Sequence, residues 1–268
     1  MKGKLRAGLA VLLCAGFLAG GGVLLWHHQQ QQAAGQLHTQ ARELVRPEVL
    51  EVLTEQPLPL VPVPVPEEPV QEPLAEEASF LLELDLEALR ATNGDVLGWI
   101  HIPDSEIDYP LLQVEDNNEY LRRAWDGTPN QAGCIFLECR SDPELEDFNT
   151  LIYGHYMRNG TMFGSLHRYQ EEEYRQSHPH IYLVTDQGVF RYEVFASYEA
   201  DVVSDTYRLI FEDEARRQSA LEGYLAASVF VPEVLPTVED RILTLSTCMG
   251  NGTYDTRWVV QGVLTGQF

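Results

Sequence analysis

A cysteine and an arginine lie on either side of a polar stretch in the last third of the chain. Cys248 ends the apolar run "ILTLSTC", and Arg257 opens the next run, "RWVVQGVL", after eight intervening residues. If these runs are consecutive antiparallel strands, facing Cα atoms lie about 5 Å apart, so the thiol and the guanidinium share one end of the sheet. A guanidinium favours the thiolate form of a nearby thiol and can hold the oxyanion of a tetrahedral intermediate. The pair therefore predicts a nucleophilic cysteine.

A cysteine nucleophile also needs a proton donor for its leaving group, and histidine titrates in the required range. His155 is our candidate among eight histidines, because it follows the strand-like run "NTLIY" and a glycine. Three other histidines, His27, His28 and His38, lie in the Gln-rich N-terminal part that is described below as a stalk. We expect His101 to be a packing or surface residue. Three more are expected to be solvated: His167, His178 and His180. Spacing alone leaves an ordinary loop histidine open at position 155, because catalytic partners are neighbours in space rather than in sequence.

The charge pattern excludes one function class and restricts the amine chemistry of the chain. All 41 acidic residues of the 268-residue chain lie beyond position 6, with only 15 of the 18 basic ones, so this part carries a net charge of −26. Nucleic-acid binding needs a basic face, so we expect no nucleic-acid partner. Both lysines, Lys2 and Lys4, precede position 7. Any amine chemistry beyond position 6 must therefore use an amine of another molecule.

The N-terminal residues predict a membrane anchor. Residues 1–6 include the basic residues Lys2, Lys4 and Arg6, and residues 7–26 are uncharged and mostly apolar. A helix over 7–26 reaches roughly 30 Å, enough to cross a bilayer, and the basic residues before it keep the N-terminus cytoplasmic. We favour an uncleaved single-pass anchor over a cleaved secretory signal, because the apolar run exceeds the usual signal core of about 7 to 15 residues. In either case we expect the remaining chain outside the cell membrane.

Residues 27–78 predict a stalk and a linker. The first part is Gln-rich and expected to be partly helical, whereas residues 57–73 contain seven prolines, which favour polyproline II. At about 3.1 Å per residue, that run makes a spacer on the order of 50 Å. Beyond it, Cys134 and Cys139 are expected on opposite faces of one strand and therefore unpaired with each other.

From residue 79 to residue 268 the hydrophobic pattern predicts one mainly β domain. We expect a helix just before the first strand, strands at 96–102, 107–113, 133–138, 150–153, 180–185, 189–198, 241–247 and 257–264, and helices near 165–176 and 212–229. The sequence "TDQG" is typical of a hairpin turn. Eight strands over roughly 190 residues suit a closed barrel or a sandwich with helices outside. The acids Glu138, Asp142 and Asp147 show no tight ligand spacing, so no metal is expected.

Three separated motifs resemble the sortases, in the form that class B members show. "TLSTC" followed by Arg257 is similar to the sortase signature, and "LIYGHYMRNGTMFGSL" is similar to the histidine segment of class B. "DVLGWIHI", "IDYPLLQ" and "DNNEYL" resemble the first strands and the following helix, so the likeness runs from about residue 86 to 264. The resemblance implies a closed eight-stranded β-barrel with an N-terminal helix and additional flanking helices, and no cofactor.

The resemblance also implies a cysteine transpeptidase of Gram-positive bacteria that acts on surface proteins bearing a C-terminal sorting motif. Cys248 would attack the carbonyl of a Thr and form a thioacyl enzyme, His155 would protonate the departing amine, and Arg257 would steady the oxyanion. The acceptor would be an amine of peptidoglycan or of its lipid-linked precursor. The implied substrate-groove residues are Asn117, Leu121, Tyr153 and Ser246.

Other functions stay open at the level of sequence. A pilin polymerase would use a lysine of another subunit, and an inactive barrel on a stalk would be a binding module. Intact Cys248, His155 and Arg257 argue against an inactive barrel. A general cysteine hydrolase of the papain type would place cysteine before histidine, whereas here His155 comes first. Order alone does not exclude a hydrolase, because hydrolysis is what a sortase does when no amine is present. Met249 and the loop after it depart from the acidic or aromatic residues often found there, which leaves the substrate preference open.

Overall fold

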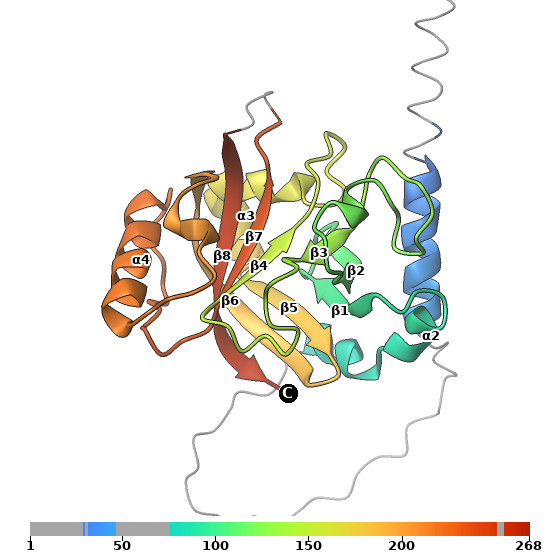
Figure 1. Cartoon of the computed structure of the whole chain (residues 1–268), viewed down its shortest axis with the longest axis horizontal. Coiled ribbons are helices and arrows are strands. Elements are labelled where there is room, and N and C mark those ends of the chain that lie inside the picture. The colour runs from blue at the N-terminus through green and yellow to red at the C-terminus, as the bar shows by residue number, and fades with distance from the viewer. Residues whose placement is uncertain (1–28, 30–31, 47–75, 251–254) are drawn as a thin grey trace, which may run out of the picture.

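All eight expected strands are present in the computed structural model, which describes residues 29, 32–46, 76–250 and 255–268. They are β1 (Val96–His101), β2 (Asp108–Leu112), β3 (Ile135–Leu137), β4 (Asn149–Tyr153), β5 (His180–Thr185), β6 (Gly188–Asp201), β7 (Ile242–Cys248) and β8 (Thr256–Gln267). They close into a barrel in the order β1-β2-β3-β4-β7-β8-β6-β5 (Figure 1). The predicted barrel is confirmed, and the sandwich alternative is wrong.

Two parallel strand pairs interrupt an otherwise antiparallel barrel. β2 pairs in parallel with β3, and β4 pairs in parallel with β7, although a long stretch of chain separates β4 from β7. The predicted hairpin at "TDQG" joins β5 to β6, with Thr185 opposite Gly188. The parallel pairing of β4 with β7 matters most for function, because it aligns the ends of two strands that are distant in sequence.

Helical segments pack outside the barrel and at one of its ends. They are the 3-10 helices η1 (Glu76–Glu83), η2 (Glu119–Leu121), η3 (Gly164–Gln170) and η4 (Asp205–Tyr207), the α-helices α2 (Leu86–Arg90), α3 (Glu172–Ser177) and α4 (Glu214–Ala227), and a helical segment over 32–45. The single helix expected at 165–176 is in fact two, η3 and α3, because the backbone of Glu171 is extended between them. The helix expected near 212–229 is confirmed as α4, and the Asp213 carboxylate caps it by accepting a hydrogen bond from the Arg216 amide at 2.8 Å.

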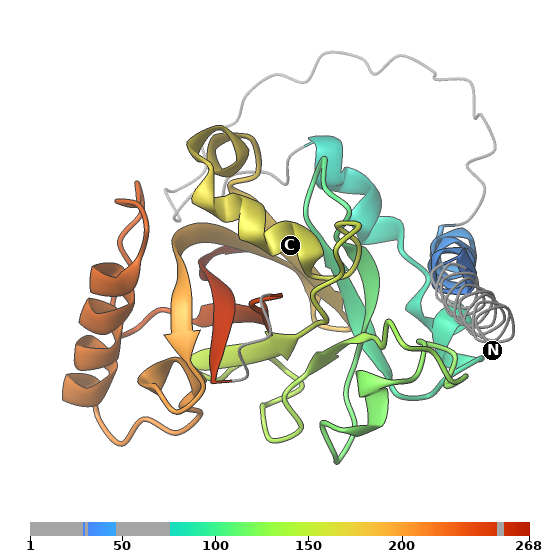
Figure 2. The same cartoon turned by 90° about the horizontal axis from the view of Figure 1, so that it is seen from above.

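The core has three parts, one inside the barrel and two between the barrel and its helices. Leu243 and Leu245 of β7 lie in the inner cluster, with residues from most of the other strands. A second cluster joins β1 and β5 to η1, α2 and the segment 32–45, and a third joins β6 and β8 to α4. Figure 2 shows α4 and the segment 32–45 on opposite sides of the barrel. Strands buried on both faces explain the continuous apolar runs of the sequence.

A buried carboxylate joins the helical segment 32–45 to the barrel. The Asp108 carboxylate is within 3.1 Å of Arg42 Nε and 2.8 Å of Arg46 Nη2, and it accepts a hydrogen bond from Trp99 at 2.8 Å. His101 Nδ1 lies 3.0 Å from the same group. Burial alone raises the pKa of Asp108, but the hydrogen bonds from His101 and Trp99 and the positive charges outweigh it, so the pKa is lowered.

Asp108→Asn is expected to destabilise the protein by about 1 to 3 kcal/mol, because Arg42 and Arg46 lose a charged partner but stay partly solvated. A lowered pKa means that the Asp108 contribution is complete above the ordinary carboxyl pKa, about 4, and is lost as the pH falls below it. Urea unfolding at neutral and acidic pH should therefore show a weaker pH dependence in the variant below about pH 4. Equal stability and equal pH dependence in both proteins would contradict this role.

The prediction of a single-pass membrane protein is corrected by the structure. Within 29, 32–46, 76–250 and 255–268, no helix has both the length and the apolar character needed to span a bilayer. The predicted anchor at 7–26 and the proline-rich run at 57–73 lie outside the described residues. The helix predicted in part of the stalk is present over 32–45, where it packs against the barrel.

Candidate active site

Cys248 and Arg257 face each other across β7 and β8, as the sequence predicts. Leu243 and Leu245 lie in the core inside the barrel, so the alternation of side chains along β7 places Cys248 on the outer face. Arg257 also lies on the outer face, because its neighbour Trp258 belongs to the inner core. Both side chains are half-buried. The thiol and the guanidinium therefore share a partly solvated surface at one end of the barrel.

His155 lies at the same end of the barrel because β4 runs parallel to β7. Tyr153 is opposite Ser246 in that pairing, and the Gly154 amide donates to the Ser246 carbonyl at 3.2 Å. Two residues further on in both strands are His155 and Cys248. The three predicted catalytic residues are thus brought together from three neighbouring strand ends, which Figure 1 shows side by side as β4, β7 and β8.

A backbone carbonyl holds the imidazole of His155. Nε2 lies 2.7 Å from the carbonyl oxygen of Leu121, at the end of η2. Because a carbonyl oxygen only accepts, Nε2 carries a proton in this arrangement, and Nδ1 is left to exchange one. The ring also lies against Gly133, whose backbone has a φ of 62°. The residues 121 to 133 therefore set the orientation of His155.

The predicted substrate residues lie around this end of the barrel in two groups. Asn117 and Tyr153 both donate to the same carboxylate oxygen of Glu138, at 2.7 and 3.1 Å. Leu121 is on the surface beside His155, and Ser246 Oγ is 2.9 Å from the hydroxyl of Tyr207. Their contact with substrate stays a prediction.

Glu138 organises the first of these groups. Its carboxylate is 3% exposed and also binds Arg140 Nε at 2.8 Å. Burial alone raises the pKa of Glu138, but the hydrogen bonds from Arg140 and Asn117 outweigh it, so the pKa is lowered. A charged, buried Glu138 fixes the amide of Asn117 and the hydroxyl of Tyr153, so that both side chains have one orientation at the surface.

Sequence reasoning missed Tyr207 and misplaced two histidines. Tyr207 lies in η4, outside any motif, and its hydroxyl reaches Ser246 while its ionisation is influenced by Arg257 and Cys248. Burial is the main reason that the pKa of Tyr207 is raised to about 12, so it is a neutral hydrogen-bonding group. The expectation that His167 and His178 are solvated is wrong. His178 is buried against Tyr174, and His167 lies next to Cys248.

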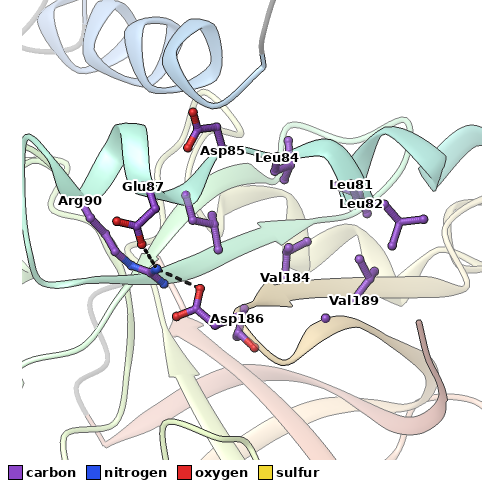
Figure 3. Close-up of a pocket in the computed structure, with 12 residues that line it drawn as sticks. Leu81, Leu82, Leu84, Asp85, Glu87, Arg90, Val184, Asp186 and Val189 are labelled. Atoms are coloured by element: carbon purple, nitrogen blue, oxygen red, sulfur yellow. Dashed lines mark hydrogen bonds and ion pairs between the residues drawn. The ribbon is translucent and has the colours of Figure 1, made fainter.

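A pocket of about 290 Å³ lies at the other end of the barrel, between α2 and the β5–β6 hairpin (Figure 3). Its lining includes Arg90, whose positive charge is already paired with the carboxylates of Glu87 and Asp186, at 2.8 and 2.9 Å. The hairpin pairs with the last residues of β8, whereas Arg257 is near the first. We therefore interpret this pocket as part of the packing interface between α2 and the barrel, separate from the active site.

Gly133→Ala is expected to disturb His155 together with the backbone that holds it. A methyl group at position 133 would lie 2.8 Å from Cδ2 of His155, and 2.7 and 2.9 Å from the carbonyl oxygens of Tyr120 and Leu121. We expect acylation of Cys248 to fall about tenfold, because small displacements of a catalytic group are costly. Gly127→Ala is the matched control, since Gly127 also has a positive φ but a methyl group there meets nothing within 4 Å. Equal acylation rates in the two variants would contradict the role given to residue 133.

Comparisons with known proteins agree with this geometry. A family model for the sortase domain matches residues 100–265. The sortase B of Listeria monocytogenes serovar 1/2a is 37% identical over 185 residues, which cover 67% of this chain and 74% of that protein. The solved structure of Bacillus anthracis sortase B in complex with AAEK1 aligns with a TM-score of 0.70 and 27% identity, over 90% of this chain and 100% of that one. A Staphylococcus aureus sortase B–substrate complex aligns with a TM-score of 0.63 and 26% identity, over 88% and 93% of the two chains. The chain therefore belongs to the sortase family of cysteine transpeptidases.

Proposed function

We propose that this sortase cleaves a C-terminal sorting motif after a Thr residue and transfers the acyl group to an amine of peptidoglycan or of its lipid-linked precursor. The observation that carries the proposal is the meeting of Cys248, His155 and Arg257 at one end of the barrel. The sortase B relatives support the same reaction class.

In the first half of the reaction, the Cys248 thiolate attacks the Thr carbonyl carbon and forms a C–S bond. Arg257 donates hydrogen bonds to the oxyanion of the tetrahedral intermediate, and its positive charge stabilises the negative charge that develops there. The intermediate then collapses, the peptide C–N bond breaks, and His155 gives its proton to the departing amine. The products are a thioacyl enzyme and the released C-terminal peptide.

In the second half, an acceptor amine attacks the thioester carbonyl. His155, now without its extra proton, takes a proton from that amine, and the C–S bond breaks to restore the thiolate of Cys248. Water in place of the amine gives hydrolysis. Since the chain has no lysine beyond Lys4, the described domain does not supply an acceptor amine of its own.

The substrate groove is assigned to the surface around these three residues. We expect Asn117, Leu121, Tyr153 and Ser246 to contact the sorting motif. Tyr207 lies against Ser246, with the two hydroxyl oxygens 2.9 Å apart. A sortase B–substrate complex exists for the Staphylococcus aureus relative, which supports a substrate-binding surface on this fold.

Intact-mass measurement of the full chain with a small library of sorting peptides tests this function. We expect a mass gain equal to the acyl fragment that resolves into an amide product when a wall-peptide amine is added. Resolution only by a lysine side chain of a protein subunit would favour a pilin polymerase instead. Folded protein that gains no acyl group from any peptide, while Cys248 still reacts with a thiol reagent, would overturn transpeptidation and favour a binding module.

A further inference from the structure

The side chain of His167 contacts one of the three proposed catalytic residues and the sequence neighbours of the other two. His167 in η3 lies with Nε2 3.0 Å from the carbonyl oxygen of Cys248. Its ring stacks on Trp258, with centroids 5.5 Å apart, and meets the ring of Tyr156 edge-on at 4.8 Å. Trp258 follows Arg257 in sequence, and Tyr156 follows His155. His167 therefore joins the ends of β4, β7 and β8.

His167 approaches from the inner side of the barrel, whereas the proposed chemistry takes place on the outer face. Trp258 belongs to the inner core, and so do Leu166 and Tyr169, which lie on either side of His167 in sequence. Successive side chains of a strand point to opposite faces, so Cys248 and Arg257 lie on the face opposite to Trp258 and point outward. The hydrogen bond of His167 goes to the backbone of Cys248 and not to its thiol, so the contact bears on the position of Cys248 rather than on proton transfer.

The contact has a defined hydrogen-bond direction. A carbonyl oxygen only accepts, so the proton lies on Nε2 of His167. Partial burial lowers the pKa of His167, and the hydrogen bond to Cys248 opposes this effect. A mainly neutral imidazole can donate to the carbonyl and still stack on Trp258 without placing a buried charge beside the thiolate.

The carbonyl of Cys248 is a critical point of the backbone, because Cys248 is the last residue of β7. Two residues later, Gly250 has a φ of 74°, and its Cα lies so close to the ring of Tyr156 that a methyl group would overlap it. The chain thus turns sharply just after the nucleophile. Fixing the carbonyl fixes the peptide plane that follows Cα of Cys248, and with it the direction of the Cα–Cβ bond that carries the thiol.

We propose that His167 is a positioning residue for transpeptidation, which holds the thiol of Cys248 in line with Arg257 by hydrogen bonding to the Cys248 carbonyl. This inference rests on the proposed function. It does not require contact between His167 and substrate, and no sequence motif pointed to it.

The variants separate the effect of losing the hydrogen-bond donor of His167 from the effect of losing its aromatic ring. His167→Phe keeps an aromatic ring on Trp258 but cannot donate, whereas His167→Gln places a donor nitrogen at the same number of bonds from Cα. His167→Leu serves as the second donor-free variant if His167→Phe does not fold. His180→Phe is the matched control, because His180 is also half-buried near a tyrosine ring but lies on β5, away from Cys248. Each full-length variant is first compared with wild type by thermal unfolding.

Two rates are then measured, acylation of Cys248 by sorting peptide and alkylation of Cys248 by iodoacetamide at neutral pH. We expect His167→Phe to lower the acylation rate by about tenfold, with the peptide KM changed by less than about twofold, because thiol alignment and not binding is lost. Alkylation should slow as well, and His167→Gln should recover most of both rates. Rates in His167→Phe equal to those of His180→Phe would overturn the proposal, and so would a failure of His167→Gln to recover activity.

The two proposals fail in different ways. If wild type is not acylated by any peptide, transpeptidation fails, and the alkylation rates alone still decide whether His167 positions the thiol. If wild type is acylated and all His167 variants match it, only the positioning role fails.

Discussion

Replacing Cys248 with alanine is expected to abolish the acyl adduct completely. The thiolate forms the bond that holds the acyl group, and no other nucleophile lies opposite Arg257 in the β7–β8 pairing. The acylation rate should therefore fall to background, with no residual mass gain after long incubation. The fold should survive, because Cys248 is half-buried at a strand end and its side chain lies outside the barrel core. Intact mass before and after incubation with peptide measures the effect.

The other described cysteines provide the control. The structure describes three free cysteines, of which Cys134 is buried and Cys139 is half-buried next to Glu138. Burial raises the pKa of the Cys134 thiol, which makes it a poor nucleophile. Cys139→Ala should form the acyl adduct at the wild-type rate. An adduct that persists in Cys248→Ala and disappears in Cys139→Ala would show that the nucleophile has been assigned to the wrong residue.

Arg257→Ala is expected to slow acylation by about two orders of magnitude or more, the usual effect of removing a main oxyanion donor. Its guanidinium lies opposite Cys248 in the strand pairing and is half-buried, so its charge is only partly screened by solvent. Nη1 donates to the adjacent carbonyl of Thr256 at 2.9 Å, which restricts the side chain at the start of β8. Single-turnover acylation monitored by mass measures the loss.

Arg257→Lys separates charge from geometry. Lysine keeps the positive charge but lacks the planar group of five donors, so we expect an acylation rate between those of wild type and Arg257→Ala. Thermal unfolding should be nearly unchanged in both variants, since Arg257 points away from the inner core. Acylation of Arg257→Ala at close to the wild-type rate would remove Arg257 from the mechanism.

The sequence by itself determined the local elements and one catalytic pair. Apolar runs separated by turn signals are set by local periodicity, and all eight strands overlap the ranges that the sequence predicts, although β6 and β8 extend beyond theirs. Cys248 and Arg257 could be paired from sequence because they end and begin adjacent antiparallel strands, so one loop fixes their register. The family resemblance then extended this local result to the whole barrel.

Local patterns left the role of His155 open and only the family resemblance assigned it, whereas the tertiary structure shows how distant residues reach that pair. His155 precedes Cys248 by 93 residues, and the two meet because β4 and β7 pair in parallel, a contact between strands that no local pattern encodes. The sequence treated His167 as solvated, although barrel closure buries one side of it against Trp258. Tyr207 reaches Ser246 in the same way, from a helix of three residues without a motif. Periodicity encodes which face of a helix or strand is apolar. The partner of that face depends on the packing of the whole chain, so local sequence patterns do not determine it.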